Sequence, residues 1–379
     1  DNIERNVSKN IRLFSFGVGY DVDTFLLDSL AQAHHGSSTY VRPGERLDEL
    51  VSAFYAKIST PVLTDLELDF GDMQVYDLYP QPLPDLFSGS QIVVVGRYRD
   101  GGTETVTLQG MVNQELQTFT FDEQTFRHDS RLSGKDTLET LPRLWATRKI
   151  GYLLTQVRLQ GPDQETIDQI VQLSIRYGIV TPYTSYLVTE PLSLGAVEQE
   201  RIAPAAMGEA LSESNAPTYG QAAVEAADDQ GALADAEAPA ELRGIAADII
   251  RNVGSRTFIF TEGMWVDTAF DPDSMEVIQV AFLSDDYFAL AETIPELAAA
   301  FSLGSQVIAF YDGVVYQVVS DSQEVQAIDI PSPAISPSDE DVPPLGQLPE
   351  DKPIENNCLY FPLSLIILPL LLLIWRRKW

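Results

Sequence analysis

The sequence predicts a multidomain chain: an α/β unit, an antiparallel β-sandwich with a helical pair, a small α+β module and a C-terminal transmembrane helix. Three observations indicate this fold class. A strand–helix–strand–helix pattern occupies residues 1–60. From Pro61 onwards, apolar and polar residues alternate with the period of two that is typical of strands. The C-terminus carries an uncharged apolar run, Asn356 to Trp375, followed by basic residues.

Composition excludes several classes of function. The chain has 379 residues and a formal net charge of −32. A nucleic-acid partner is excluded, because binding one requires clustered Lys and Arg. A single cysteine, Cys358, excludes an internal disulfide framework, and with only three histidines it argues against a Cys/His zinc site. The strong negative charge suits a secreted or surface protein that avoids self-association.

The α/β unit begins with a short apolar run, Ile11–Gly19, which predicts a buried strand that ends in a glycine turn. Asp21 or Asp23 can then cap a helix that continues to Gly36, and residues 38–41 form a second strand. A closing helix is predicted over residues 46–59, because its apolar residues recur on one helical face. Two parallel strands cannot bury both of their faces. We therefore expect earlier strands of the same sheet to precede Asp1.

The segment FSFGVGYDVDTFLLDSLAQAHHGSSTYV, residues 14–41, resembles the last strands and helices of a von Willebrand factor type A domain. It is more closely similar to the bacterial relatives of the inter-alpha-trypsin inhibitor heavy chains. The resemblance implies a truncated Rossmann-like α/β fold in residues 1–60. It also implies a Mg²⁺ site built from Asp-x-Ser-x-Ser, a Thr and an Asp, all upstream of this segment. No catalytic, cofactor-binding or metal-binding residue is therefore assigned, and Mg²⁺ is expected only if that upstream motif is present.

Residues 61–131 predict a small antiparallel β-sandwich, since alternating runs are separated by clusters of Pro, Gly and Asp. Within them, YDLYPQPLPDLFSGSQIVVVGRY is close to the heavy-chain pattern. In that family, strands from before and after the A domain combine into one sandwich. The resemblance thus implies that the sheet lacks some of its partners here and has open edges.

Residues 138–195 predict a helical pair and a strand, with a break at Gly161-Pro162-Asp163 and a stop at Gly178. The segments LWATRKI and IVQLSIRYGIVTPYTSYLV are the most specific resemblance to the heavy chains. Two interpretations of this region exist. One is a ligand groove shaped by three side chains, and the favoured one is a buried support that locks the A domain to the sandwich. The three side chains are Tyr183, Thr184 and Tyr186.

The second half of the chain predicts one more folded module between two unfolded segments. Residues 196–240 are rich in Ala and acidic residues with few large apolar side chains, which predicts a disordered linker. Residues 241–330 predict a small α+β module: a helix, a hairpin turning at Glu262-Gly263, a further strand, one helix over residues 285–304 and a hairpin turning at Asp312-Gly313. Residues 331–357 are rich in Pro and acidic residues and predict an extended stalk.

Residues 358–375 predict a transmembrane helix, because the uncharged run just spans a hydrocarbon core of about 30 Å. The basic tail, residues 376–379, predicts a cytoplasmic C-terminus by the positive-inside rule. We therefore expect a single-pass membrane protein whose bulk lies outside the cytoplasm. Stalk, apolar run and basic tip also resemble a bacterial sorting tail, although the Leu-Pro-x-Thr-Gly signal is absent. Cys358 is interpreted as a bystander rather than a lipid or disulfide site.

Other chemistry-bearing residues give weak patterns. Adjacent His34 and His35 point to different helix faces, so a helix-terminal cap is favoured over a metal site. His128-Asp129-Ser130 are sequence neighbours, which is not evidence of a catalytic triad. An acidic group departs from the spacing of a calcium loop and lacks its turn glycine. That group consists of Asp267, Asp271, Asp273 and Glu276.

The residues and the resemblance together predict a non-enzymatic, membrane-anchored extracellular protein. Its expected partner is an extracellular protein or polysaccharide, bound through a metal-dependent site in the part preceding Asp1. The alternative is a non-catalytic envelope scaffold or assembly protein, sorted by a C-terminal processing tail. A hydrolase is disfavoured, because the sequence shows no nucleophile elbow, P-loop or dinucleotide fingerprint.

Overall fold

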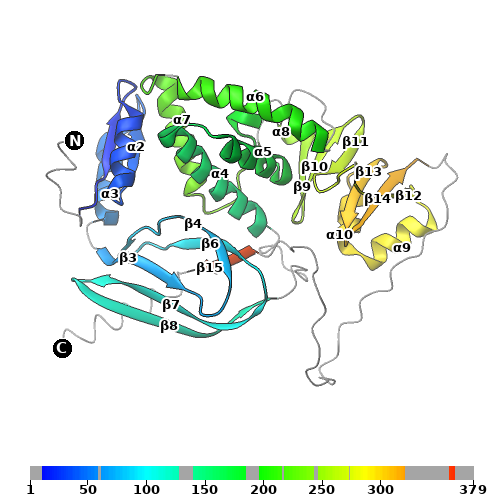
Figure 1. Cartoon of the computed structure of the whole chain (residues 1–379), viewed down its shortest axis with the longest axis horizontal. Coiled ribbons are helices and arrows are strands. Elements are labelled where there is room, and N and C mark those ends of the chain that lie inside the picture. Colours follow the sequence, from blue (N-terminus) through cyan, green and yellow to red (C-terminus); the bar gives the residue numbers. More distant parts are fainter. Residues whose placement is uncertain are drawn as a thin grey trace. The chain divides into compact units, whose positions relative to one another are not determined.

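The computed structural model describes residues 11–58, 61–127, 140–184, 196–215, 217–242, 246–272, 274–320 and 358–362 (Figure 1). The chain divides into two compact units. The first unit comprises Asp1–Ile170, Met207–Ala240 and Asn356–Trp379, and the second comprises Val171–Ala206 and Glu241–Glu355. The predicted mixed α/β and β architecture is present, since these described residues form helices and four sheets.

The first unit opens with a parallel pair of strands, as the sequence predicts. β1 (Ser15–Val18) and β2 (Ser38–Val41) pair in parallel, with Ser15 opposite Ser38. Between them, α2 (Thr24–Ala33) starts at Asp23, whose side chain accepts from the Leu26 amide at 3.0 Å. α3 (Leu47–Ile58) follows, and its Phe54 packs edge-on against two aromatic side chains of the β1 region.

The β-sandwich follows directly and has two sheets. One sheet has the order β5-β3-β7-β8 and the other β15-β6-β4. Apolar residues from both sheets meet in one core that includes Leu63, Leu108 and Val94. The strands are β3 (Pro61–Asp69), β4 (Val75–Tyr79), β5 (Leu86–Phe87), β6 (Val93–Tyr98), β7 (Gly102–Val112) and β8 (Glu115–Phe126).

The predicted helical pair is present as α4 (Leu141–Gln160) and α5 (Gln164–Tyr177). The strand predicted after it is absent from residues 179–184, where 182–184 form a 3-10 turn, and residues 185–195 lie outside the described residues. The predicted linker over residues 196–240 is wrong, because it contains α6 (Ala196–Ser214) and α7 (Gln221–Ala234). α7 packs along α4 within the first unit (Figure 1). Small side chains make this packing possible, since the α7 backbone approaches α4 at Gly151 more closely than any side chain would allow.

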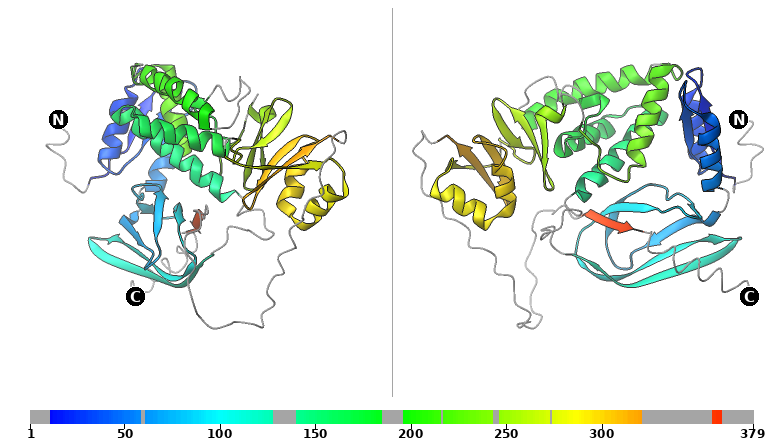
Figure 2. Two further views of the ribbon diagram at one scale, coloured as in Figure 1. Left: turned by 45° about the vertical axis from the view of Figure 1, so that its right-hand side comes forward. Right: turned by 180° about the vertical axis from the view of Figure 1, so that it is seen from behind.

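The predicted transmembrane helix over residues 358–375 is also corrected. Cys358–Pro362 forms a strand, β15, which pairs antiparallel with β6, with Cys358 opposite Arg97 (Figure 2). An apolar strand satisfies its backbone hydrogen bonds by pairing with a sheet edge. Among the helices that the structure describes, none has the length and apolarity to cross a bilayer. Residues 363–379 lie outside the described residues.

The second unit contains the predicted α+β module. Its sheet has the order β12-β14-β13-β11-β10-β9, and α9 and α10 pack against one side of it. The two predicted hairpin turns are confirmed, since all four turn residues have the positive φ of a type I′ turn. The elements are α8 (Ala246–Ile249), β9 (Ile250–Val253), β10 (Arg256–Thr261), β11 (Met264–Asp267), β12 (Val277–Ala281), α9 (Asp285–Thr293), α10 (Pro295–Phe301), β13 (Val307–Tyr311) and β14 (Val314–Val319).

Two details of this module differ from the sequence pattern. The helix expected before the first hairpin stops at Ile249, and the chain continues as β9, which pairs with β10. The single helix expected from Asp285 onwards is divided at Ile294, whose extended backbone separates α9 from α10. Pro295 explains the division, because a proline disfavours the helical conformation of the residue before it. The stalk predicted over residues 331–357 lies outside the described residues.

Candidate functional site

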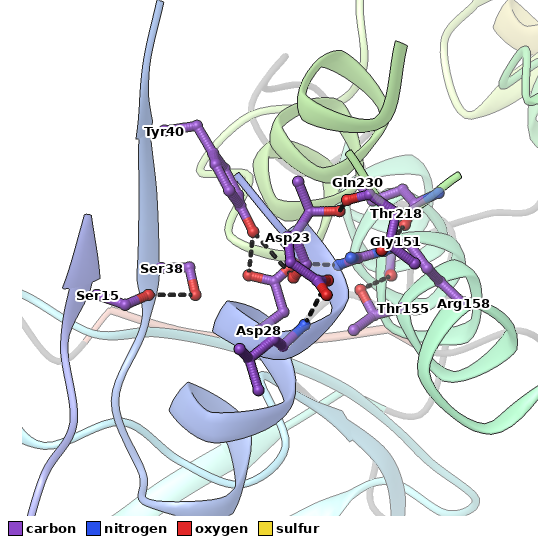
Figure 3. A network of polar contacts seen from close by, with 12 residues as sticks. Ser15, Asp23, Asp28, Ser38, Tyr40, Gly151, Thr155, Arg158, Thr218 and Gln230 are labelled. Carbon is purple, nitrogen blue, oxygen red and sulfur yellow. Dashed lines mark hydrogen bonds and ion pairs between the residues drawn. The ribbon is translucent and has the colours of Figure 1, made fainter. Parts of the chain in front are cut away.

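A polar network of the first unit joins three helices and a strand (Figure 3). Arg158, in the last turn of α4, forms an ion pair with Asp28 of α2. Its Nε donates to Gln230 Oε1 of α7 at 2.8 Å. The side chains of Arg158 and Asp28 are only 19% and 14% exposed, so their attraction is weakly screened. We call Asp28, Tyr40, Arg158 and Gln230 the polar clamp.

Tyr40 brings β2 into the clamp. Its hydroxyl donates to Asp28 Oδ1 at 2.8 Å and lies 3.2 Å from the carbonyl oxygen of Thr24. Burial, and then the charge of Asp28, raise the pKa of Tyr40 above its ordinary value. Tyr40 therefore stays neutral near pH 7 and keeps its proton for the hydrogen bond. Asp28 in turn has both carboxylate oxygens bound, one by Tyr40 and one by Arg158.

The segment that leads into α7 is tied to the same α/β pair. The backbone amide and the hydroxyl of Thr24 both donate to the carbonyl of Thr218, at 2.9 and 3.0 Å. The Gly220 amide donates to the Tyr20 carbonyl at 2.8 Å, and Asp228 of α7 pairs with Arg42 just after β2. These bonds place the start of α7 beside α2 and β2, and Gln230 joins Arg158 farther along the same helix.

At its other end, α4 is anchored on the sandwich. Arg148 is almost fully buried, and its Nε donates to the carbonyl of Ala236 at 2.6 Å. Its Nη1 donates to the carbonyls of Val93 and Tyr79, in β6 and β4. Its neighbour Lys149 pairs with Asp77 at 2.7 Å, and the indole nitrogen of Trp145 donates to the Asp77 carbonyl at 3.0 Å. α4 thereby connects the α/β pair, the sandwich and α7.

The polar clamp can hold α2 and β2 in a fixed orientation, but its side chains do not suit catalysis. Its one carboxylate is neutralised by Arg158 and its one phenol is held protonated. Within the described residues, no cluster of three or more His, Cys, Asp or Glu is placed to hold a metal ion. One donor of the clamp has no partner among the described residues: Arg158 Nη1 is buried without a hydrogen bond. We assign the clamp a mechanical role, in which it fixes α2 and β2 on α4.

Among the described residues, the acidic group that the sequence singles out forms no cluster placed to hold a metal ion. The carboxylate of Asp267 is buried and is shared among the Arg256 guanidinium at 3.1 Å and the amides of Ala269 and Phe310. Asp271 accepts from Ser274 Oγ at 2.7 Å instead of approaching Asp267. Glu276 is exposed, and Asp273 lies outside the described residues.

The structure also places the histidines and tyrosines that the sequence singles out. His34 is the C-cap of α2, as predicted, and His35 follows with a positive φ of 50°. Tyr183 and Thr184 are buried, which disfavours a ligand groove at these two residues. They belong to the second unit, whereas the α/β pair and the sandwich belong to the first, so the predicted lock between those two parts stays a prediction. Tyr186 and the triplet at 128–130 lie outside the described residues, as does the side chain of Cys358.

Sequence reasoning did not find the clamp. Asp28 and Arg158 are 130 positions apart, and Arg158 and Gln230 are 72 apart, so no local spacing connects them. A partial signal exists for a different contact, the anchor of α4 on the sandwich, because Arg148 shares a helix face with the buried residues Leu144 and Gly151. A charged residue within an apolar helix surface indicates a buried partner, although not which one.

No protein-family model matches the chain. Curated relatives do match, among them several inter-alpha-trypsin inhibitor heavy chains. Heavy chain H3 of Rattus norvegicus is 30% identical over 201 residues, which cover 50% of this chain and 23% of that protein. Heavy chain H2 of Sus scrofa is 30% identical over 200 residues, 49% of this chain and 21% of that protein. Heavy chain H4 of Homo sapiens is 28% identical over 197 residues, 50% of this chain and 21% of that protein.

These matches confirm the resemblance drawn from the residues: half of the chain is related to the inter-alpha-trypsin inhibitor heavy chains. The chain spans less than a quarter of the length of the relatives it matches.

Proposed function

We propose that this relative of the heavy chains is part of a non-catalytic extracellular protein that binds a protein or polysaccharide ligand. The observation that carries the proposal is the polar clamp in a heavy-chain-like chain. Asp28 and Tyr40, in the α/β pair, are bound by Arg158 of α4, and α4 is bound by Arg148 to the sandwich. Such a chain of buried bonds suits a protein that must keep a binding fold oriented while a ligand pulls on it.

The support for an extracellular, non-catalytic role has two parts. The relatives are heavy chains, which is consistent with a role other than catalysis. The net charge of −32 favours solubility and disfavours self-association and nucleic-acid binding. The proposed Mg²⁺ dependence rests on the resemblance of residues 14–41 to the end of a von Willebrand factor type A domain, which implies a metal site upstream of them.

The test compares two purified proteins on arrays of extracellular proteins and polysaccharides. One is this chain, and the other also contains the residues encoded immediately upstream of Asp1. We expect saturable binding by the longer protein, and loss of that binding in EDTA with recovery on adding Mg²⁺. Binding that is unchanged in EDTA would contradict the metal-dependent mechanism. The absence of any ligand that binds saturably would contradict the adhesion proposal.

A second candidate function, a scaffold or assembly protein, is favoured by a separate observation. Large apolar side chains are exposed on the α/β pair and α3, which is typical of surfaces that bind other proteins. They include Val18, Phe25, Leu26, Leu50, Val51 and Tyr55.

Crosslinking in cells followed by affinity purification separates the two candidates. A stoichiometric envelope protein crosslinked to α2 or α3 would support the scaffold. Recovery of an added extracellular ligand, with no envelope partner, would support the adhesion protein.

A further inference from the structure

The second unit contains a strand with a free edge. β12 is the last strand in its sheet and pairs only with β14 (Figure 1). Just beyond it, the Phe282 amide donates to the Val319 carbonyl at 2.8 Å. Because alternate residues of a parallel strand bond to the same neighbour, the amides and carbonyls of Val277 and Gln279 point away from β14. Nothing in the described part of the chain pairs with that outer side.

The side chains along this edge do not protect it. Val277 and Ile278 are 37% and 36% exposed, and Leu283, two residues beyond the strand, is 56% exposed. β12 itself has no charged residue, proline or bulge, which are the usual protections of an edge. An unprotected edge of β-branched residues is a template for one more strand.

Two other edge strands of the described sheets show such protections. β9, at the opposite edge of this sheet, exposes Arg251. β8, the edge of the four-stranded sheet, has Glu115 at its start and a bulge at Asp122 and Glu123, where Glu123 has a φ of 56°. β8 and β9 are therefore protected edges, whereas the outer edge of β12 is not.

Charge indicates what the edge would accept. Residues 246–320, which make up this module, contain eleven Asp or Glu and two Arg, a formal charge of −9. Glu276 directly precedes β12, and Asp285 and Asp286 follow it at the start of α9. The two aspartates also suit the helix N-terminus, but Glu276 has no helix to stabilise. A basic partner would be attracted to this field, whereas a second copy of the same unit would be repelled.

We propose that the outer edge of β12 binds an extended peptide segment of a partner protein as an added strand. The segment has β-branched or other apolar residues in its centre and Lys or Arg at both ends. Its backbone bonds to the outward groups of Val277 and Gln279, its apolar side chains cover Val277 and Ile278, and its ends face the carboxylates. This site lies in the second unit and is independent of the proposed ligand binding by the α/β fold.

The test uses the full chain and a fluorescein-labelled probe peptide, Lys-Thr-Val-Thr-Val-Thr-Arg. We expect fluorescence anisotropy to rise with chain concentration, and hydrogen exchange at the amides of Val277, Gln279 and Ala281 to slow on adding peptide. Two control peptides define the interaction. One has Glu at both ends, and the other carries N-methyl groups on the alternate amides that would face β12. Both should bind at least about tenfold more weakly, since they lose charge attraction or backbone bonds.

Three variants separate binding from folding. Gln279→Pro removes an outward amide but no bond to β14, so it should weaken peptide binding about tenfold and leave the urea midpoint unchanged. Gln279→Thr keeps the amide and should bind as the parent chain does. Ile278→Pro removes an amide that bonds to β14, and so should lower the urea midpoint.

Several results would overturn the proposal. One is the absence of peptide-dependent protection at Gln279, and another is equal binding of the Glu-ended peptide. A third is slow exchange at Gln279 without peptide. If that protection rises with chain concentration, a second copy occupies the edge, and if it does not, other residues of the same chain occupy it. Should Gln279→Pro unfold the unit, the N-methylated peptide decides with the parent chain unchanged.

Discussion

Gly151 of α4 lies directly against Ala234 of α7: a Cβ at position 151 would be 2.2 Å from the Ala234 backbone nitrogen. Real Cβ atoms essentially never approach a backbone atom so closely, so only glycine permits this contact between the helices. The contact explains how an Ala-rich segment with few large side chains becomes the packed helix α7. Close approach of two backbones replaces the burial of large side chains.

This contact predicts opposite effects for the same substitution in two helices. Gly151→Ala should lower the free energy of unfolding by about 1–3 kcal/mol, because α7 must move away from α4. At Gly231 of α7, an added Cβ would meet open space. Gly231→Ala should therefore raise the free energy of unfolding by about 0.5–1 kcal/mol, the usual gain in helix propensity. Urea unfolding followed by far-UV circular dichroism measures both. Equal effects of the two changes would show that the helices do not pack as described.

The polar clamp predicts that substitutions of Asp28 and Arg158 have coupled effects on stability. Arg158→Met leaves the buried Asp28 carboxylate without its cation and should cost about 3 kcal/mol, and Asp28→Asn should cost a similar amount by leaving the guanidinium unpaired. The double variant should lose clearly less than the sum, because both changes remove one interaction. The double-mutant cycle, measured by urea unfolding, gives the coupling free energy. Arg46→Met, which breaks an exposed ion pair with Asp48, is the matched control and should change nothing measurable.

The contacts of Arg148 predict a loss of stability on substitution that a lysine at this position does not restore. Arg148→Met leaves the carbonyls of Ala236 and Val93 without their buried donor and should cost about 3 kcal/mol or more. Arg148→Lys keeps the charge but lacks the planar guanidinium that reaches carbonyls on separate segments. Its free energy of unfolding should therefore remain well below that of the parent chain. Arg99→Met, at an exposed position, is the control. Full stability of the lysine variant would contradict the assigned geometry.

Two buried tyrosines predict a fall in stability at alkaline pH. Burial raises the pKa of both Tyr40 and Tyr79 above the ordinary value near 10, and the charges of Asp28 and Asp77 add to the effect. Above about pH 10 the unfolded chain loses these protons while the folded chain keeps them, so the stabilisation present below that pH is lost as pH rises.

Urea midpoints measured between about pH 9 and pH 11 should therefore fall less steeply for Tyr40→Phe and Tyr79→Phe than for the parent chain. Absorbance at the tyrosinate band should show these two protons leaving together with unfolding. Tyr55→Phe provides the control, since it removes an exposed phenol and leaves both buried ones in place. Identical slopes for all variants would contradict the burial of Tyr40 and Tyr79.

Local patterns predicted much of the fold. The glycines and the alternating periods identified β1, α2 and β2, the strands of the sandwich and both hairpins of the second unit, because turns and amphipathic faces depend on neighbouring residues. The segment 196–240 was predicted wrongly for the complementary reason. Its composition lacks large apolar residues, but α7 packs on α4 through Gly151, a residue far away in the sequence.

The structure of the C-terminal segment also depends on a contact with a distant part of the chain. Its apolar residues are compatible with a membrane span or with a sheet strand, and only the open edge of β6 decides for the strand at Cys358–Pro362. The polar clamp is also invisible in the sequence, since Asp28 and Arg158 become partners only when α2 packs beside α4.

The sequence by itself determined the relationship to the heavy chains, the order of most helices and strands, and the strongly acidic character of the chain. The tertiary structure alone decided that α7 is a packed helix, that Arg158 closes the polar clamp on Asp28, and that the outer edge of β12 has no neighbour among the described residues. The reason is physical: short-range patterns set backbone conformation, whereas burial, ion pairing and free strand edges depend on which distant segments meet.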